Sequence, residues 1–121
     1  MRKLIDTVSA LYQKPPDEAA DERTNILQNV EDDWRLPNLP NVLPREHLHP
    51  VVRLGRSMVM IYRGVPAGVT EIRPGDWVAL TQGTAMLHQR GEHGHVISQR
   101  VPAADVVWAG TDVNEYHYVP R

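Results

Sequence analysis

Cysteine is absent from this chain of 121 residues, which excludes disulfide bonds and metal sites built from thiolates. Its stability must therefore come from packing. No apolar run approaches the roughly 18 to 20 residues that cross a membrane, and Asp6 interrupts the start, where a secretory signal needs continuous apolar residues. These absences lead us to expect a soluble, cytoplasmic protein without a membrane partner.

A strong charge of one sign is also missing, because the formal net charge is −2. Residues 50–121 contain six acidic and seven basic residues, so we do not expect the broad basic surface that binds nucleic acid. Eleven of the thirteen basic residues are arginine, whose guanidinium suits bidentate contacts with phosphate. This composition is compatible with one or two arginines that hold a small phosphate-containing ligand.

The first half of the chain predicts helices and then an extended connector. Apolar residues at helical spacing indicate one helix over residues 4–12 and a second from its cap Asp17 to about Asp32. The residues of this segment expected to face inward are Ala19, Ala20, Ile26, Leu27, Val30 and Trp34. Prolines at 37, 40, 44 and 50 argue against regular structure in the connector. We expect these segments to cover a β core within a single domain of residues 1–121.

Residues 50–121 contain short apolar runs separated by turns, which are typical of strands. The expected strands are 51–54, 58–63, 77–80, 95–101, 105–108 and 115–119. The sequence RPGD at 73–76 predicts a turn, because Pro74 fixes φ and Gly75 tolerates positive φ. A short helix is expected after Thr81, with Gly91 as its stop. Helices followed by strands predict an α+β fold.

Three positions are candidates for a functional site, and each has a simpler structural explanation. Arg63 ends an apolar run before Gly64, which suits a guanidinium aimed at a ligand but equally a salt bridge at a strand end. Thr81 combines a helix cap with a hydroxyl at a strand end. Glu115 opens a strand as a carboxylate, although Asp112 in the preceding loop competes for the same role.

The segments "YRG", "IRPGDWVALTQGTAMLHQ" and "VPAADVVWAGTDVNEYHY", in this order and spacing, resemble the ADP-ribosyltransferase-like domains of phage and prophage proteins. The resemblance covers about residues 58–119. It implies a split β-sandwich of two small, mainly antiparallel sheets around a cleft that binds NAD. It also implies transfer of ADP-ribose to a host or defence-system macromolecule.

The resemblance implies a role for each candidate. Arg63 would hold an NAD phosphate, Thr81 or Thr84 would order the nicotinamide ribose, and Glu115 would be the catalytic carboxylate. Three more residues are NAD-contact candidates that the family motif does not assign: Tyr62 and Trp77 as aromatic rings against the nicotinamide, and Gly64 as a close approach of the backbone. The sequence departs from the family pattern at Val113, where arginine-modifying and guanine-modifying relatives have glutamate or glutamine. Transfer to arginine is therefore not expected.

Two other functions compete with this hypothesis. The departure at Val113 favours a non-catalytic interaction protein, which keeps the transferase scaffold and binds a partner. The histidines His88, His93 and His95 have ligand spacing for a metal, but a solvated glycine-rich turn explains them, so no metal is expected. No Ser-His-Asp or Cys-His arrangement and no phosphate-binding glycine loop is visible, so hydrolase and kinase functions have no support.

Overall fold

The computed structural model describes residues 18–48, 57–89, 91 and 93–121. Its strands form two small antiparallel sheets. One sheet pairs β1 (Met58–Val65) with β3 (His95–Pro102), and the other has the order β2 (Trp77–Val78), β5 (Tyr116–Tyr118), β4 (Val106–Trp108). The predicted α+β class is confirmed. The predicted helix over residues 4–12 and the predicted strand over 51–54 lie outside the described residues.

The two sheets meet at one bridge between Tyr62 of β1 and Ala79, which directly follows β2. The amide of each residue donates to the carbonyl of the other, at 2.9 and 2.8 Å. The predicted strand over 77–80 is therefore shorter than expected within its own sheet, because Ala79 leaves β5 to pair with β1. This exchange of partners brings β1, β2 and β5 together around the candidate site residues.

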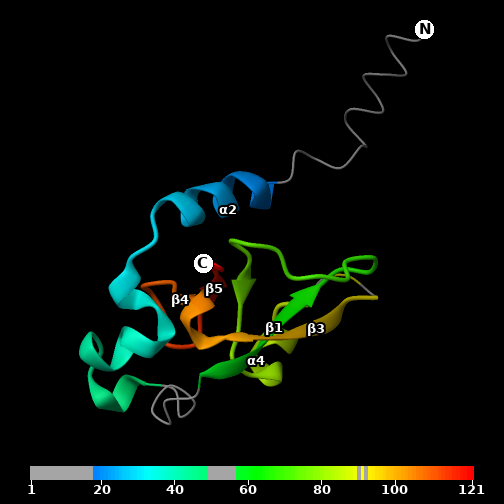
Figure 1. Ribbon diagram of the computed structural model, residues 1–121. Helices are drawn as coiled ribbons and strands as arrows, with labels where there is room; N and C mark the ends of the chain where they lie inside the picture. The colour runs from blue at the N-terminus through cyan, green and yellow to red at the C-terminus, as the bar shows by residue number, and fades with distance from the viewer. Residues whose placement is uncertain (1–17, 49–56, 90, 92) are drawn as a thin grey trace, which may run out of the picture.

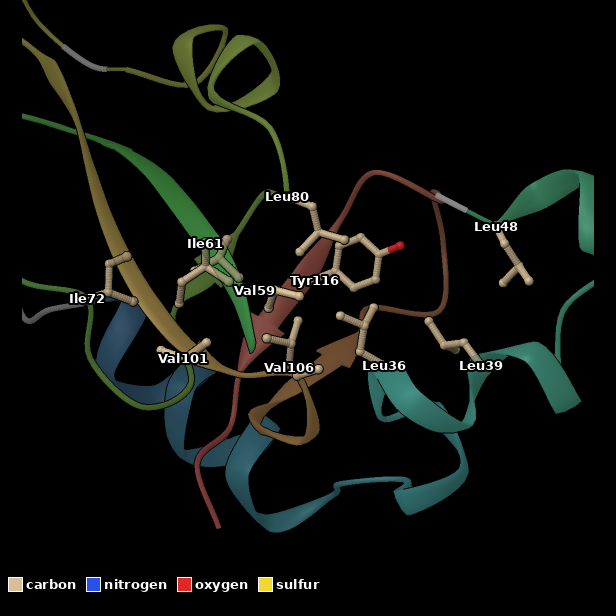
Figure 2. Packing of buried hydrophobic residues seen from close by; sticks show 12 residues of the cluster. Leu36, Leu39, Leu48, Val59, Ile61, Ile72, Leu80, Val101, Val106 and Tyr116 are labelled. Atoms are coloured by element: carbon tan, nitrogen blue, oxygen red, sulfur yellow. The ribbon is translucent and has the colours of Figure 1, made fainter. Parts of the chain in front are cut away.

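The hydrophobic core lies where the sheets meet the N-terminal part of the chain (Figures 1 and 2). Alternate residues of β1, including Val59 and Ile61, point into it, as the period of two in a strand requires. Leu36 and Leu39 project into the same core from the N-terminal part, close to Tyr116 (Figure 2). The Tyr116 hydroxyl donates to the Val113 carbonyl at 2.8 Å, and burial raises the pKa of that hydroxyl to about 12.

The proline-rich connector is not extended, contrary to the sequence prediction. It forms short 3-10 helices over Leu36–Asn41 and Arg45–His47, with Pro40 inside the first. The φ angle that proline fixes, near −65°, also falls within the range of a 3-10 helix, and so short a helix needs few amide donors. Proline therefore ends α-helices here without preventing helical turns.

Helix α2 (Glu18–Gln28) ends four residues earlier than predicted. Ile26 and Val30 are half-buried as expected, but Leu27 was wrongly predicted to face inward, since 41% of its surface is exposed. Helix α2 lies along one side of the sheets (Figure 1). Among the described residues, no helix is long and apolar enough to cross a membrane.

Arg35 attaches the N-terminal part to the β core. Its buried guanidinium donates to the carbonyls of Ala104 and Val119, at 2.7 and 2.8 Å, and to the Asp32 carboxylate at 2.9 Å. Its backbone also bridges Val107 of β4. The side chain thus satisfies carbonyls that would otherwise be buried without a donor.

We expect Arg35→Met to lower the unfolding free energy by about 2 to 3 kcal/mol, because buried carbonyls would lose a charged donor. Chemical denaturation followed by circular dichroism measures this change. Arg45→Met, at an exposed arginine of the same segment, is the matched control and should change stability by less than about 0.5 kcal/mol. Equal effects of the two substitutions would contradict the structural role of Arg35.

Candidate functional site

Arg63 lies near the end of β1, and its guanidinium is engaged on the β2 side. Nη1 donates to the Trp77 carbonyl at 2.8 Å, and Nε lies 3.7 Å from the Asp76 carboxylate. The side chain is partly exposed, at 23%. The charge near the end of β1 thus has an anionic partner within the protein. This partner, Asp76, is a site residue that the sequence analysis missed.

The Asp76 carboxylate is only 2% exposed and anchors the predicted RPGD turn. One oxygen accepts from the Arg73 amide at 2.8 Å, and the other lies 3.4 Å from Nη1 of Arg23 in α2. The turn itself is confirmed: the Asp76 amide donates to the Arg73 carbonyl, and Gly75 has a φ of 89°. A buried carboxylate requires such partners, since burying an unpaired charge is costly.

Thr81 and Thr84 lie together at the start of helix α4 (Gln82–Met86). The Thr81 hydroxyl donates to the Thr84 hydroxyl at 2.9 Å and accepts from the Thr84 amide at 3.3 Å. The predicted cap is therefore confirmed, although the helix ends well before Gly91. Because the two hydroxyls are hydrogen-bonded to each other, both lie at the start of α4, and the structure does not favour one of them over the other as a ribose ligand.

Gly64 brings α4 close to β1. A Cβ at this position would lie 2.5 Å from the Gln89 amide nitrogen and 2.7 Å from the His88 carbonyl carbon. The backbone of the segment that begins with α4 therefore rests directly on the strand. This contact places Thr81 and Thr84 on a segment that packs against the strand of Arg63.

Glu115 directly precedes β5, and its carbonyl accepts from the Ala109 amide. Its Oε2 accepts from the Thr111 hydroxyl at 3.1 Å. The competing carboxylate of Asp112 accepts from the Asn114 amide at 2.8 Å. Asp112 thus stabilises the loop, whereas Glu115 begins the strand that pairs with β2.

Strand register shows which candidates share a face. Trp77 pairs with His117 and Tyr62 pairs with Ala79, and paired residues point to the same side of a sheet. Because alternate residues of a strand also share a face, Tyr62, Trp77, Glu115 and His117 lie on one side. The ring of Trp77 contacts that of His88, with centroids 4.4 Å apart.

Strand alternation places Arg63 on the opposite side from Glu115, together with the buried Ile61 and Val65. The long guanidinium nevertheless reaches the Trp77 carbonyl in the plane of the sheet. Arg63 and Glu115 therefore approach the β2–β5 pair from different sides. The charges of both side chains nevertheless affect the pKa of one buried residue of β5.

That residue is His117, which is 7% exposed and was missed by the sequence analysis. Its Nδ1 lies 3.2 Å from the Gly75 carbonyl; because a carbonyl only accepts, Nδ1 carries the proton. Burial lowers the pKa of His117, and the Arg63 charge lowers it further, whereas the Gly75 bond and the charges of Glu22 and Glu115 raise it. The sequence signal for His117 was the alternation of polar and aromatic residues in "EYHY", which places His117 two residues after Glu115.

Among the described residues, no group of three histidine, aspartate or glutamate side chains is arranged to hold a metal ion. Comparison of the chain with protein-family models, with curated proteins and with solved structures found no match. The site must therefore be interpreted from its own chemistry.

We expect Gly64→Ala to lower the unfolding free energy by about 1 to 3 kcal/mol, because the added methyl group would force the segment after α4 away from β1. Thermal or chemical denaturation measures this change. Gly83→Ala is the matched control: a Cβ there meets nothing within 4 Å, and alanine favours a helix by up to about 1 kcal/mol. Equal destabilisation by both substitutions would show that α4 does not rest on Gly64.

The lowered pKa of His117 predicts a pH-dependent stability. A pKa below the ordinary 6.5 means that the unfolded chain binds a proton more readily than the folded protein. The stabilisation is therefore complete above pH 6.5 and is lost as the pH falls through the folded-state pKa. We expect His117→Asn to have a shallower decline of unfolding free energy below pH 6.5 than wild type, and identical slopes would contradict this.

Proposed function

We propose that this protein is an NAD-dependent mono-ADP-ribosyltransferase-like protein, with its site between β1, the start of α4 and the start of β5. The observation that supports the proposal best is that Trp77 of β2 links the segments of Arg63 and Glu115. Its carbonyl accepts from the Arg63 guanidinium at 2.8 Å, and it pairs with His117, two residues after Glu115. The Tyr62–Ala79 bridge adds the third segment, because Thr81 follows β2 by three residues. The two small sheets are compatible with a split β-sandwich.

Each residue has a role that its chemistry suits. The Arg63 guanidinium binds the diphosphate of NAD, sharing its charge with Asp76, and the Thr81 or Thr84 hydroxyl orders the nicotinamide ribose. Tyr62 and Trp77 lie on the face of Glu115 and pack the nicotinamide ring. Gly64 keeps the segment that begins with α4 close to β1.

The reaction breaks the bond between nicotinamide and C1′ of the ribose. Nicotinamide leaves with the electron pair of that bond, and the sugar gains positive charge, which the Glu115 carboxylate stabilises mainly in the transition state. A nucleophilic atom of the acceptor then bonds to C1′ and releases its proton to solvent. Val113 supplies no carboxylate beside Glu115, so a guanidinium acceptor is not expected.

A second candidate function is a non-catalytic interaction protein built on the same scaffold. Two observations favour it. The Asp76 carboxylate and the Trp77 carbonyl already bind the Arg63 guanidinium, as a purely structural arginine requires. Met86 and Leu87 at the end of α4 are 53% and 82% exposed, and exposed apolar side chains of this size suit a protein partner.

NAD binding and nicotinamide release distinguish the two functions. We expect Glu115→Gln to slow nicotinamide release about 100-fold or more, since it removes the charge aimed at the transition state, with little change in NAD affinity. Arg63→Lys should weaken NAD binding about tenfold, because lysine keeps the charge but loses the bidentate geometry. Calorimetry and release of labelled nicotinamide measure these effects.

Glu71→Gln and Arg100→Lys are matched controls at exposed positions, and both should behave as wild type. A bacterial lysate supplied with labelled NAD then tests transfer to macromolecules. If the wild-type protein neither binds NAD nor releases nicotinamide, the enzymatic proposal is wrong and the interaction-protein hypothesis replaces it.

A further inference from the structure

We propose that His117 is a positioning residue of the site. Its Nδ1–H donates to the Gly75 carbonyl and so fixes the turn of residues 73–76 on β5. That turn and Trp77, which follows it, hold the Arg63 guanidinium. The part of this inference that concerns NAD binding and nicotinamide release rests on the proposed function. Its structural part concerns three elements far apart in the chain, and it is testable without NAD.

The first step is the attachment of the turn to β5. The Gly75 amide donates to the Tyr118 carbonyl at 2.6 Å, and the Tyr118 amide donates to the Asp76 carbonyl at 2.9 Å. The Gly75 carbonyl accepts from the His117 ring. Main-chain bonds therefore hold the turn to Tyr118, and a side-chain bond holds it to the neighbouring residue. Only this last bond depends on the identity of a side chain in β5.

The second step leads from the turn to Arg63. Asp76 follows Gly75 directly, and its carboxylate lies beside Nε of Arg63. Trp77, the next residue, accepts from Nη1 of the same guanidinium and pairs with His117 across the sheet. These two partners of Arg63 thus belong to the segment that His117 binds.

The third step concerns Glu115, which directly precedes β5 and lies two residues before His117. The neutral imidazole leaves the charge of Glu115 intact. A protonated ring would keep its bond to Gly75, since both nitrogens then donate. The positive charge would, however, be attracted by Glu22 of α2 and by Glu115 and repelled by Arg63. The site therefore requires the neutral form.

The test compares three substitutions. Asparagine places an amide N–H close to the position of Nδ1 and does not titrate, so His117→Asn should keep the bond to Gly75 at every pH. His117→Leu has a similar volume but lacks the donor. His47→Asn, at an exposed histidine, controls for loss of a titrating ring elsewhere.

The first readout needs no ligand. We expect the Nε–H signal of Arg63 in nitrogen-15 NMR to shift in His117→Leu and to stay near its wild-type position in His117→Asn. The Gly75 amide should exchange with solvent faster in His117→Leu alone. Unchanged Arg63 and Gly75 signals in His117→Leu would overturn the proposal, and so would a failure of His117→Asn to fold.

The second readout is NAD binding and nicotinamide release between about pH 5 and 8, the range in which a histidine changes charge. His117→Leu should bind NAD about tenfold more weakly, since a buried carbonyl loses its donor, and His117→Asn should bind as wild type does. Nicotinamide release by wild type should fall at acid pH, with a smaller fall in His117→Asn. Weak binding by His117→Asn, or an unchanged pH profile, would overturn the positioning role.

The two proposals fail separately. If wild type does not bind NAD but the Arg63 signal responds to His117→Leu and recovers in His117→Asn, the proposed function is wrong while the positioning of Arg63 stands. If NAD binds and both His117 variants match wild type in signals, affinity and pH profile, the function stands and His117 has no part in it.

Discussion

The buried carboxylate of Asp76 is the constraint on which the arrangement around the site depends. A carboxylate taken out of water needs cationic or N–H partners, and Asp76 obtains them from α2, from β1 and from its own turn. These elements are distant in sequence, so the anion helps to fix their relative positions. Arg63 consequently has a structural role in addition to any role in ligand binding, since its guanidinium stabilises the Asp76 carboxylate.

The N-terminal part contributes to the β core rather than standing apart from it. Leu36 and Leu39 enter the same core as Tyr116. Arg35 donates to the carbonyls of Ala104 and Val119, near the C-terminal end of the chain. Trp34 lies over Gly110, where a Cβ would come within 2.7 Å of the indole. The loop that leads to Glu115 is thus packed against the N-terminal part, and the support of the site reaches back to that segment.

Local patterns predicted the strands, the RPGD turn and the Thr81 cap, because each depends on residues within a few positions of one another. The alternation in β1, for example, matches the burial of Val59 and Ile61. The contacts of Arg63 with Asp76 and Trp77 were not predictable in this way, since they depend on the bridge between β1 and Ala79. The 3-10 helices were missed because proline was treated as a breaker of all helices. His117 was missed because a lone histidine in a strand gives no sign of what lies opposite.

The junction between the sheets has a mechanical consequence. At Tyr62 and Ala79 the two ladders are joined by a pair of main-chain hydrogen bonds, each worth about 1 kcal/mol net. Beside this junction the Arg63 guanidinium also donates to the Trp77 carbonyl, so side-chain and main-chain bonds together join the two sheets. Main-chain hydrogen bonds therefore run without a break from β3 through β1 to β2 and β5, so the two sheets cannot separate unless these bonds are broken.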